Sequence, residues 1–223
     1  MKPTLAIGDV HGCTYWQQAV SDHPDRHVVF LGDYLDPYDY VPRKQLLANL
    51  QRIVELKLRR PHDVTLLLGN HDLHYFDDNA LLGSRFDWQL KPLAQALFTE
   101  LRSLFCYAYQ DGNRLFTHAG VAHRWFVDDF GGNPLLPVSP QLNRPSSEQL
   151  AALFRVGAAR GGRRGTTGGI FWADISELSD PLHGFTQVVG HNRVPQVTER
   201  VGAPGSRIIF CDCLSHQQYA LVD

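Results

Sequence analysis

The 223-residue sequence predicts an α/β fold, which some schemes class as α+β, with a sheet that is mainly parallel at its start. Short apolar runs at residues 4–7, 27–31 and 63–68 alternate with segments of helical period, as in strand–helix–strand units. A glycine and polar residues follow each run. Ligands bind at the carboxyl ends of strands in such sheets. We therefore expect a functional site at that edge.

The first strand, residues 4–7, ends in Gly8-Asp9-Val10-His11-Gly12. Asp9 and His11 alternate along the chain, so their side chains should point the same way. This pattern alone fits a plain strand-to-helix turn as well as a pair of ligands. A short helix is expected next, from Trp16 to Val20.

The second strand, residues 27–31, ends in the similar segment Gly32-Asp33-Tyr34-Leu35-Asp36. This repetition at a second strand end favours a site over chance. A helix is expected from Pro42, because proline suits the first helical turn, and it should stop before Pro61. Its apolar positions recur at helical spacing, which marks it as part of the scaffold.

The third strand, residues 63–68, leads into Gly69-Asn70-His71-Asp72. The glycine allows a sharp turn directly after the apolar run. An amide and an imidazole at one strand end suit a hard metal and a proton transfer beside it.

A hairpin follows later in the chain. Strands at 104–109 and 114–117 flank Asp111-Gly112, a strong turn signal, so the pairing should become antiparallel there. The second of these strands ends in His118-Ala119-Gly120. A covering helix is expected before them, within residues 87–102, where leucines recur at helical spacing.

The last part of the sequence is expected to contain a loop and further strands. The assignments are a loop at 131–145, a helix at 150–154 capped by Ser146 and Gln149, a strand at 184–189 that ends in Gly190-His191-Asn192, and strands near 207–211 and 218–222. Because no repeat or linker divides the chain, we expect one domain over residues 1–223.

Residues 157–169 have the most unusual composition, rich in glycine and arginine. Such a segment is either a flexible loop or a backbone cradle for an anion. Composition alone favours the flexible loop.

Charge and hydropathy limit the partners. A formal net charge of -2 and a pI near 6.6 provide no positive field for nucleic acid. No stretch approaches the roughly 20 apolar residues of a membrane helix, and the first residues run into a strand rather than a signal peptide, so a cytoplasmic protein is expected. The four cysteines form no C-x-x-C pair, and Cys211 and Cys213 read as packed thiols rather than ligands or disulfides.

Strand ends thus carry carboxylate, amide and imidazole groups. They are Asp9 with His11, Asp33 with Asp36, Asn70 with His71, His118, and His191. Groups of this kind hold two adjacent divalent metals, and one carboxylate can bridge them. The sequence therefore predicts a metal site.

The order GDVHG, GDYLD, GNHD, HAG and GHN resembles that of the calcineurin-like metallophosphoesterases. This family includes Ser/Thr phosphoprotein phosphatases and bis(5′-nucleosyl)-tetraphosphatases, and the resemblance covers residues 4 to about 222. It implies a four-layer sandwich of two mixed β-sheets flanked by helices, with both metals at the sheet ends.

The resemblance also implies roles for the motif residues. Asp9, His11 and Asp33 would hold one metal, and Asp33, Asn70, His118 and His191 would hold the other. His71, oriented by Asp36, would give a proton to the leaving oxygen, unless it is a structural histidine. A metal-bridging hydroxide would attack phosphorus in line. The two divalent ions are expected to be Mn²⁺, with Fe or Zn²⁺ as alternatives.

Two departures from the family pattern concern arginines. Phosphoprotein phosphatases have a phosphate-binding arginine after the second motif, where this chain has Pro37-Tyr38. Arg193 replaces the second histidine of the superfamily's G-H-x-H motif, as in the phosphoprotein phosphatase branch. Because that phosphate-binding arginine is missing, an arginine of the Gly/Arg segment is expected to bind the phosphate instead. Arg160 is the first candidate and Arg163 or Arg164 the next. Asn70 is also expected to contact the substrate.

The sequence thus predicts a metal-dependent phosphoesterase that hydrolyses phosphomonoesters, with phosphoproteins among its candidate substrates. A hydrolase of dinucleoside polyphosphates or other nucleotides is the alternative enzyme. A metal-binding scaffold without turnover is the alternative from another class. Expected partners are a phosphorylated small molecule, a nucleotide or a phosphoprotein, with no membrane and no nucleic acid; the sequence leaves the oligomeric state open.

Overall fold

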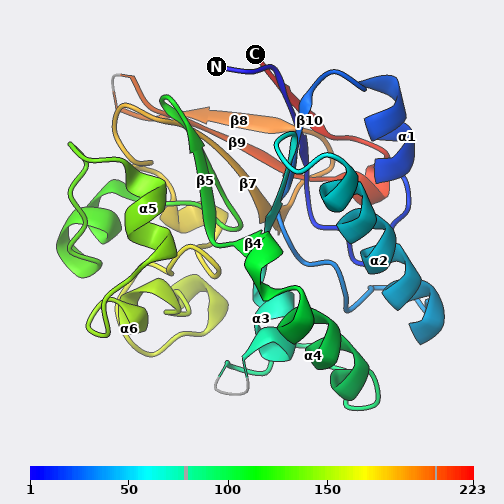
Figure 1. Ribbon diagram of the computed structural model, residues 1–223. Coiled ribbons are helices and arrows are strands. Elements are labelled where there is room, and N and C mark those ends of the chain that lie inside the picture. Colours follow the sequence, from blue (N-terminus) through cyan, green and yellow to red (C-terminus); the bar gives the residue numbers. More distant parts are fainter. Residues whose placement is uncertain (78–79, 204) are drawn as a thin grey trace.

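The computed structural model describes residues 1–77, 80–203 and 205–223, and its strands form two five-stranded sheets (Figure 1). The first sheet has the order β10 (Ala220–Val222), β1 (Thr4–Ile7), β2 (His27–Phe30), β3 (Val64–Leu67) and β4 (Phe105–Cys106). The second has the order β5 (Ala108–Asp111), β6 (Arg114–Thr117), β7 (Thr186–Arg193), β9 (Arg207–Asp212) and β8 (Thr198–Val201).

Both sheets are mixed. Strands β1 to β4 run parallel, and β10 pairs antiparallel with β1. In the second sheet β6, β7 and β9 run parallel, whereas β5 and β8 are antiparallel edge strands. The predicted fold of two mixed sheets with flanking helices is confirmed.

The helices lie around the sheets. In Figure 1, α1 (Trp16–Asp22) and α2 (Arg43–Arg59) lie on the flank of the first sheet, and α5 (Val138–Asn143) and α6 (Leu150–Leu153) lie on the opposite flank. Helices α3 (Asn70–Phe76) and α4 (Lys91–Glu100) pack against each other below the sheets. Short turns of other helix types are at Arg102–Leu104, Trp125–Asp129, Ala158–Arg160, Ile175–Glu177 and Leu214–His216.

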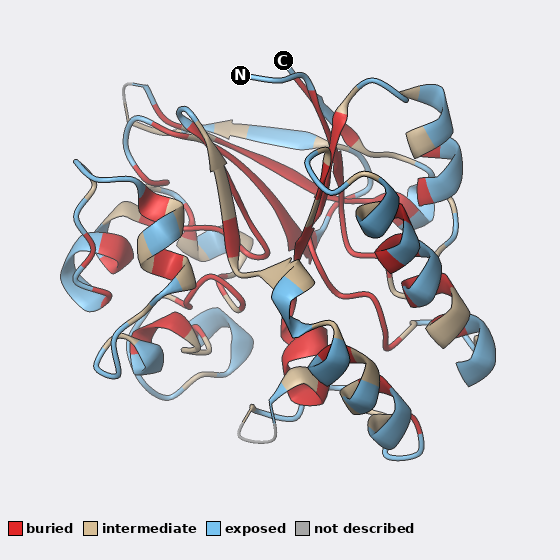
Figure 2. Ribbon diagram, viewed as in Figure 1, coloured by how far each residue is buried: buried red, intermediate tan, exposed pale blue. Residues whose placement is uncertain are grey.

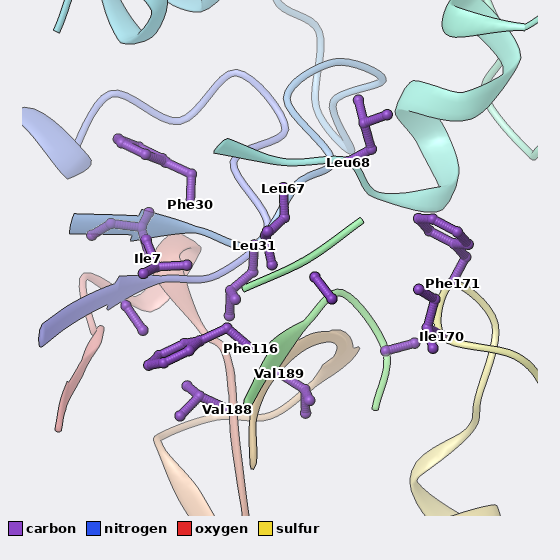
Figure 3. Close-up of a cluster of buried hydrophobic side chains, with 14 of the residues drawn as sticks. Ile7, Phe30, Leu31, Leu67, Leu68, Phe116, Ile170, Phe171, Val188 and Val189 are labelled. Carbon is purple, nitrogen blue, oxygen red and sulfur yellow. The ribbon is translucent and has the colours of Figure 1, made fainter. Parts of the chain in front are cut away.

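The core lies between the two sheets. Figure 3 shows Leu31, which follows β2, on the side of Phe116 and Val188 from the second sheet. Phe30 points to the opposite face of the first sheet, where its ring packs against Trp16 of α1 with 5.5 Å between centroids. Leu31, Phe116, Val188 and Phe30 are all fully buried. Figure 2 shows the central strands buried along their length, whereas the edge strand β8 is largely exposed and the outer helices each keep an exposed face. Apolar burial on this scale fixes the strand ends relative to one another. No helix in the described part of the chain is long and apolar enough to span a membrane.

The strand predicted at 104–109 is divided between the two sheets. Phe105 and Cys106 pair with β3, and from Ala108 onward the chain pairs with β6. The crossing is stabilised by Asn143 of α5, whose Oδ1 accepts the N–H groups of Tyr107 at 2.7 Å and Ala108 at 3.0 Å. A polar contact distant in sequence therefore ends one strand and starts the next.

Three other assignments differ from the sequence-based ones. The loop predicted at 131–145 contains α5, because Val138 and Leu142, four residues apart, bury one face. Strand β8 was not predicted, since it is an exposed edge strand without an apolar run. Helix α3 was not predicted either, and it begins at Asn70, inside the third motif.

We expect Asn143→Ala to lower the free energy of unfolding by about 2 kcal/mol, because two backbone N–H groups and the Ala108 carbonyl would lose their partner. Urea unfolding followed by circular dichroism measures this loss. Asn143→Asp is the matched control, since it keeps the acceptor for both N–H groups and should cost less. Equal losses in the two variants would contradict the assigned role.

Candidate metal centre

One group of potential ligands lies at the ends of β1 and β2. Potential ligand atoms of Asp9, His11 and Asp33 all lie within 4.8 Å of one another. The His11 Nε2 is 3.5 Å from the Asp33 Oδ2 and 3.9 Å from the Asp9 Oδ2. The His11 Nδ1 donates to the Leu35 carbonyl at 2.7 Å, so in the neutral ring Nε2 carries a free lone pair.

A second group lies at the ends of β3, β6 and β7. The Asn70 Oδ1 is 2.9 Å from the His118 Nε2 and 2.8 Å from the His191 Nδ1. The His118 Nε2 is also 3.6 Å from the Asp33 Oδ2. Asp33 therefore lies between the two groups, the position of a bridging carboxylate.

The tautomer of His118 indicates that the second group fits a cation. Its Nδ1 must donate to the Leu31 carbonyl at 2.7 Å, so the Nε2 of the neutral ring has no proton. The Asn70 Oδ1 lies 2.9 Å from this bare nitrogen, so the amide oxygen and the imidazole present two acceptor atoms to the same point, as ligands of one cation do. The His191 Nε2 is buried and has no hydrogen-bond partner among the described residues. The donor set of carboxylate, amide and imidazole suits a divalent metal.

The pKa shifts in both groups are those expected of residues that bind a divalent metal. Burial, followed by neighbouring carboxylates, raises the pKa of Asp9 and of Asp33 well above the ordinary value. Burial lowers the pKa of His11 and of His118 to about 3, and it lowers that of His191 as well. The imidazoles are therefore neutral at pH 7, as metal ligands must be, and a nearby cation would stabilise the charged form of the carboxylates.

The backbone is strained at these positions. His11, Asp33 and His191 have φ of 42°, 53° and 60°, a left-handed conformation that is uncommon for residues with a side chain. The register of β7 with β9 shifts between Val189 and Arg193, so the strand is irregular around His191. Gly190 permits the close approach, since a Cβ there would lie 2.1 Å from the Asp9 Oδ1.

Asp72 holds two of the strand ends together. Its Oδ2 accepts the N–H groups of Asp33 at 2.7 Å and Gly69 at 2.8 Å, and its Oδ1 accepts the Tyr34 N–H at 2.9 Å. Burial raises its pKa to about 7, against the opposing effect of these bonds. Asp72 is the last residue of the GNHD motif, but no pattern in the sequence assigned it this role.

His71 and Asp36 form a pair beside the two groups. The His71 Nδ1 donates to the Asp36 Oδ2 at 2.9 Å, and the His71 ring packs edge-on against the His11 ring, with 5.3 Å between centroids. Burial lowers the pKa of His71, against the effect of Asp36.

Asp36 has two further neighbours that the sequence did not indicate, His74 and Tyr75 of α3. The His74 Nε2 lies 2.8 Å from the Asp36 Oδ2, and the Tyr75 hydroxyl donates to the Asp36 Oδ1 at 2.6 Å. Atoms of Asp36, His71 and His74 are close enough to hold an ion. Burial would raise the pKa of Asp36, but the donors around it outweigh burial and lower that pKa, so we read these residues as a hydrogen-bonded cluster. His74 and Tyr75 follow His71 by three and four residues, a spacing that places them on the same face only in a helix. The sequence did not predict that helix, so it did not indicate these two residues.

The two predicted phosphate-binding arginines differ in position. Arg160 donates to the Asn192 Oδ1 at 2.7 Å and pairs with Asp174 at 2.9 Å, and its charge contributes to the lowered pKa of His118. Arg163 is exposed, and no hydrogen bond or ion pair joins it to the ligand groups among residues 1–77, 80–203 and 205–223. The structure therefore brings Arg160, but not Arg163, toward the site.

Three further charged residues that the sequence did not assign to the site also lie there. Asp212, at the end of β9, forms a hydrogen bond with Asp9, and burial raises its pKa to about 6. The guanidinium groups of Arg85 and Arg193 lie 3.8 and 4.2 Å from the centre of the Tyr38 ring. Only the fold could reveal them, because they come from separate segments.

A cleft of about 490 Å³ opens beside Asn70. Its walls are mainly apolar and aromatic, with Phe76, Tyr107, Phe154 and Trp172 among the lining residues. The Trp172 ring also lies edge-on to the His191 ring, with 6.0 Å between centroids. The cleft is therefore continuous with the second ligand group.

The fold and the donor set together define a metal-binding α/β sandwich. The chain belongs to the calcineurin-like phosphoesterase family, which it matches over residues 2–202. This family is metal-dependent, as the donor set requires. The family predicted from the sequence motifs is confirmed.

Individual relatives agree with this assignment. Over 76 residues the chain is 40% identical to a protein phosphatase 2A catalytic subunit from Dictyostelium discoideum, covering 32% of this chain and 22% of that protein, which agrees with the predicted phosphoprotein phosphatase branch. Two structures of cold-active protein-tyrosine phosphatase, one from a psychrophilic Shewanella species, align with 97% of this chain and 72% and 71% of theirs. Their TM-scores are 0.59, and identities of 16% and 18% mean that this likeness concerns the fold alone.

Metal removal should make the stability of the protein, measured relative to that of the metal-loaded protein, fall as pH rises from about 6.5 to 8. The pKa of Asp72 is about 7 in the folded chain and about 3.9 when unfolded, so the folded state binds more protons and loses stability as pH rises through this range. The raised pKa values of Asp9 and Asp33 act in the same direction. The histidines act oppositely, because unfolded imidazoles are still half protonated at about pH 6.5 and lose those protons by about pH 8. This contribution cancels when metal-free and metal-loaded protein are compared, because the folded imidazoles are neutral in both.

Thermal unfolding with EDTA and with Mn²⁺ across this window measures the effect. Deprotonation of Asp72 alone lowers the free energy of unfolding of the metal-free protein by about 1 kcal/mol between pH 6.5 and 8. The metal-loaded protein should lack this loss, because a cation stabilises the charged carboxylates, so its stability should rise relative to that of the metal-free protein across the window. Parallel profiles would contradict the proposed ligand groups.

Proposed function

We propose that this protein is a dinuclear-metal phosphoesterase that hydrolyses phosphomonoesters. The observation that carries this proposal is the position of Asp33 between the two ligand groups, with the His71–Asp36 pair beside them. Asp9, His11 and Asp33 would hold one ion, and Asp33, Asn70, His118 and His191 the other. Mn²⁺ is the proposed metal, and Fe or Zn²⁺ would also accept these mixed nitrogen and oxygen ligands.

Two divalent ions would supply an activated water and neutralise phosphoryl oxygens. The protein's own side chains would position the ions and the substrate and would supply a proton. The Leu35 and Leu31 carbonyls fix the His11 and His118 rings, so that each presents a bare nitrogen. Reorganisation of the site during the reaction is thereby kept small.

His71 is the proposed general acid. Asp36 holds its Nδ1–H, so the opposite nitrogen, Nε2, is the atom that would carry the proton to the leaving oxygen. The lowered pKa of Asp36 keeps that carboxylate charged, and a charged Asp36 stabilises the imidazolium form of His71. The alternative for His71 is a purely structural role.

The cleft beside Asn70 supports a substrate with an organic group on its phosphate. Its apolar and aromatic walls would hold that group while Asn70 and Arg160 lie near the phosphoryl group. A phosphoprotein side chain, a phosphorylated small molecule or a nucleotide all carry such a group. Hydrolysis of nucleotides is the second candidate activity.

A substrate panel tests this function. Metal-loaded protein should release phosphate from p-nitrophenyl phosphate and from a phosphoserine or phosphotyrosine peptide, and EDTA should abolish the release. Preferential cleavage of dinucleoside polyphosphates would favour the nucleotide alternative. Metal-loaded protein without turnover on any member would support a non-catalytic metal-binding protein.

His71→Asn should lower kcat by about 10²- to 10⁴-fold, the usual contribution of a general acid, while both metals stay bound. Asn70→Ala should instead reduce the metal content, because it removes a ligand oxygen of the second group. Elemental analysis together with steady-state kinetics separates the two effects. Loss of both metals from the His71 variant would show that the two roles are wrongly assigned.

A further inference from the structure

The site lacks an arginine where phosphoprotein phosphatases have one, since Pro37 follows Asp36 in the chain. We propose that Arg85 takes this role and binds the phosphoryl group of the substrate. Arg85 belongs to the segment between α3 and α4, far in sequence from the second motif. This inference rests on the function proposed above and names a substrate-binding residue for it.

The guanidinium of Arg85 lies where the missing side chain would begin. Its Nε donates to the backbone carbonyl of Asp36 at 3.0 Å, so it touches the residue that directly precedes Pro37. Its Nη2 lies 3.2 Å from the His71 Nε2, the atom proposed to carry the proton. Arg85 is therefore on the side where the leaving oxygen would depart.

Aromatic packing orients Arg85. Its guanidinium lies 3.8 Å from the centre of the Tyr38 ring, and that ring packs edge-on against His11 with 4.9 Å between centroids. Tyr38 therefore links the arginine to a metal ligand. Stacking of this kind restricts a guanidinium, and the Tyr38 hydroxyl also accepts one hydrogen bond from Arg85.

Backbone contacts hold the segment against the site. The Gly83 N–H donates to the His74 Nδ1 at 3.1 Å, and the Asp87 N–H donates to the Tyr75 hydroxyl at 3.0 Å. The side chain of Asp87 pairs with Arg43 of α2 at 2.6 Å. Arg85 itself has a φ of 64°, a strained conformation that persists only where surrounding contacts impose it.

The donors of Arg85 suit a phosphoryl group. A guanidinium has five N–H donors in a planar fork, and the contacts with Asp36 and His71 leave donors for an anion. No carboxylate side chain among the described residues forms an ion pair with Arg85. Arg160, in contrast, is already paired with Asp174.

Binding of inorganic phosphate to Mn²⁺-loaded full-length protein tests the proposal independently of turnover. We expect Arg85→Ala to weaken phosphate binding by about 10- to 100-fold in calorimetry, as for loss of a charge-assisted bond, with unchanged metal content. Arg85→Lys should bind with intermediate affinity, because it keeps the charge but not the fork. Arg124→Ala is the matched control, since that side chain is 87% exposed, and it should bind phosphate as wild type does.

Kinetics on p-nitrophenyl phosphate supply the second readout. The kcat/KM of Arg85→Ala should fall by about 10- to 100-fold, and added guanidinium should restore part of it but leave wild type unchanged. If Arg85→Ala loses metal or unfolds, Arg85→Lys decides, and wild-type phosphate affinity in that variant overturns the proposal. Unchanged phosphate affinity in a folded, metal-loaded Arg85→Ala overturns it as well.

The two proposals fail separately. If wild type binds phosphate through Arg85 but hydrolyses no phosphoester, the proposed function fails and the assignment of Arg85 stands. If wild type hydrolyses phosphomonoesters and Arg85→Ala matches it in both readouts, the assignment fails and the function stands.

Discussion

The buried carboxylate of Asp72 is the interaction on which the site depends. It accepts backbone N–H groups from the ends of β2 and β3, and those two ends carry Asp33 and Asn70. One side chain therefore sets the distance between the shared carboxylate and the second ligand group. It also places another acidic group near Asp9 and Asp33, which increases the demand for positive charge at this edge. A cation bound at this edge would therefore stabilise the folded chain.

The other proposed ligands are held by backbone groups in a similar way. Backbone carbonyls of Leu35 and Leu31, in the segment that follows β2, fix the His11 and His118 rings, and the backbone N–H of His191 donates to Asp9 at 2.8 Å. The left-handed residues and Gly190 permit these close approaches, at a cost in backbone strain that the core between the sheets offsets. A site built from strand ends of both sheets thus inherits its rigidity from the packing of those sheets.

The sequence predicts the part of this arrangement that is local. Apolar runs followed by glycine and polar residues identify the ends of β1, β2 and β3, and with them Asp9, Asp33 and Asn70, because a strand and its turn are encoded by neighbouring residues. Contacts between distant segments are not encoded in that way. The division of residues 104–109 between two sheets depends on Asn143, and the position of Arg85 depends on anchors in α2 and α3. Composition likewise could not separate Arg160 from Arg163, since only the fold places one of them near His118.

The edge-on contact between Trp172 and His191 has a practical consequence. An indole beside a ligand of the second group, at the wall of the cleft, is an intrinsic optical reporter. Its fluorescence should respond to the arrival of a metal at His191 and to an aromatic ring that enters the cleft. Occupancy of the centre and occupancy of the cleft can then be followed in real time in the unlabelled protein.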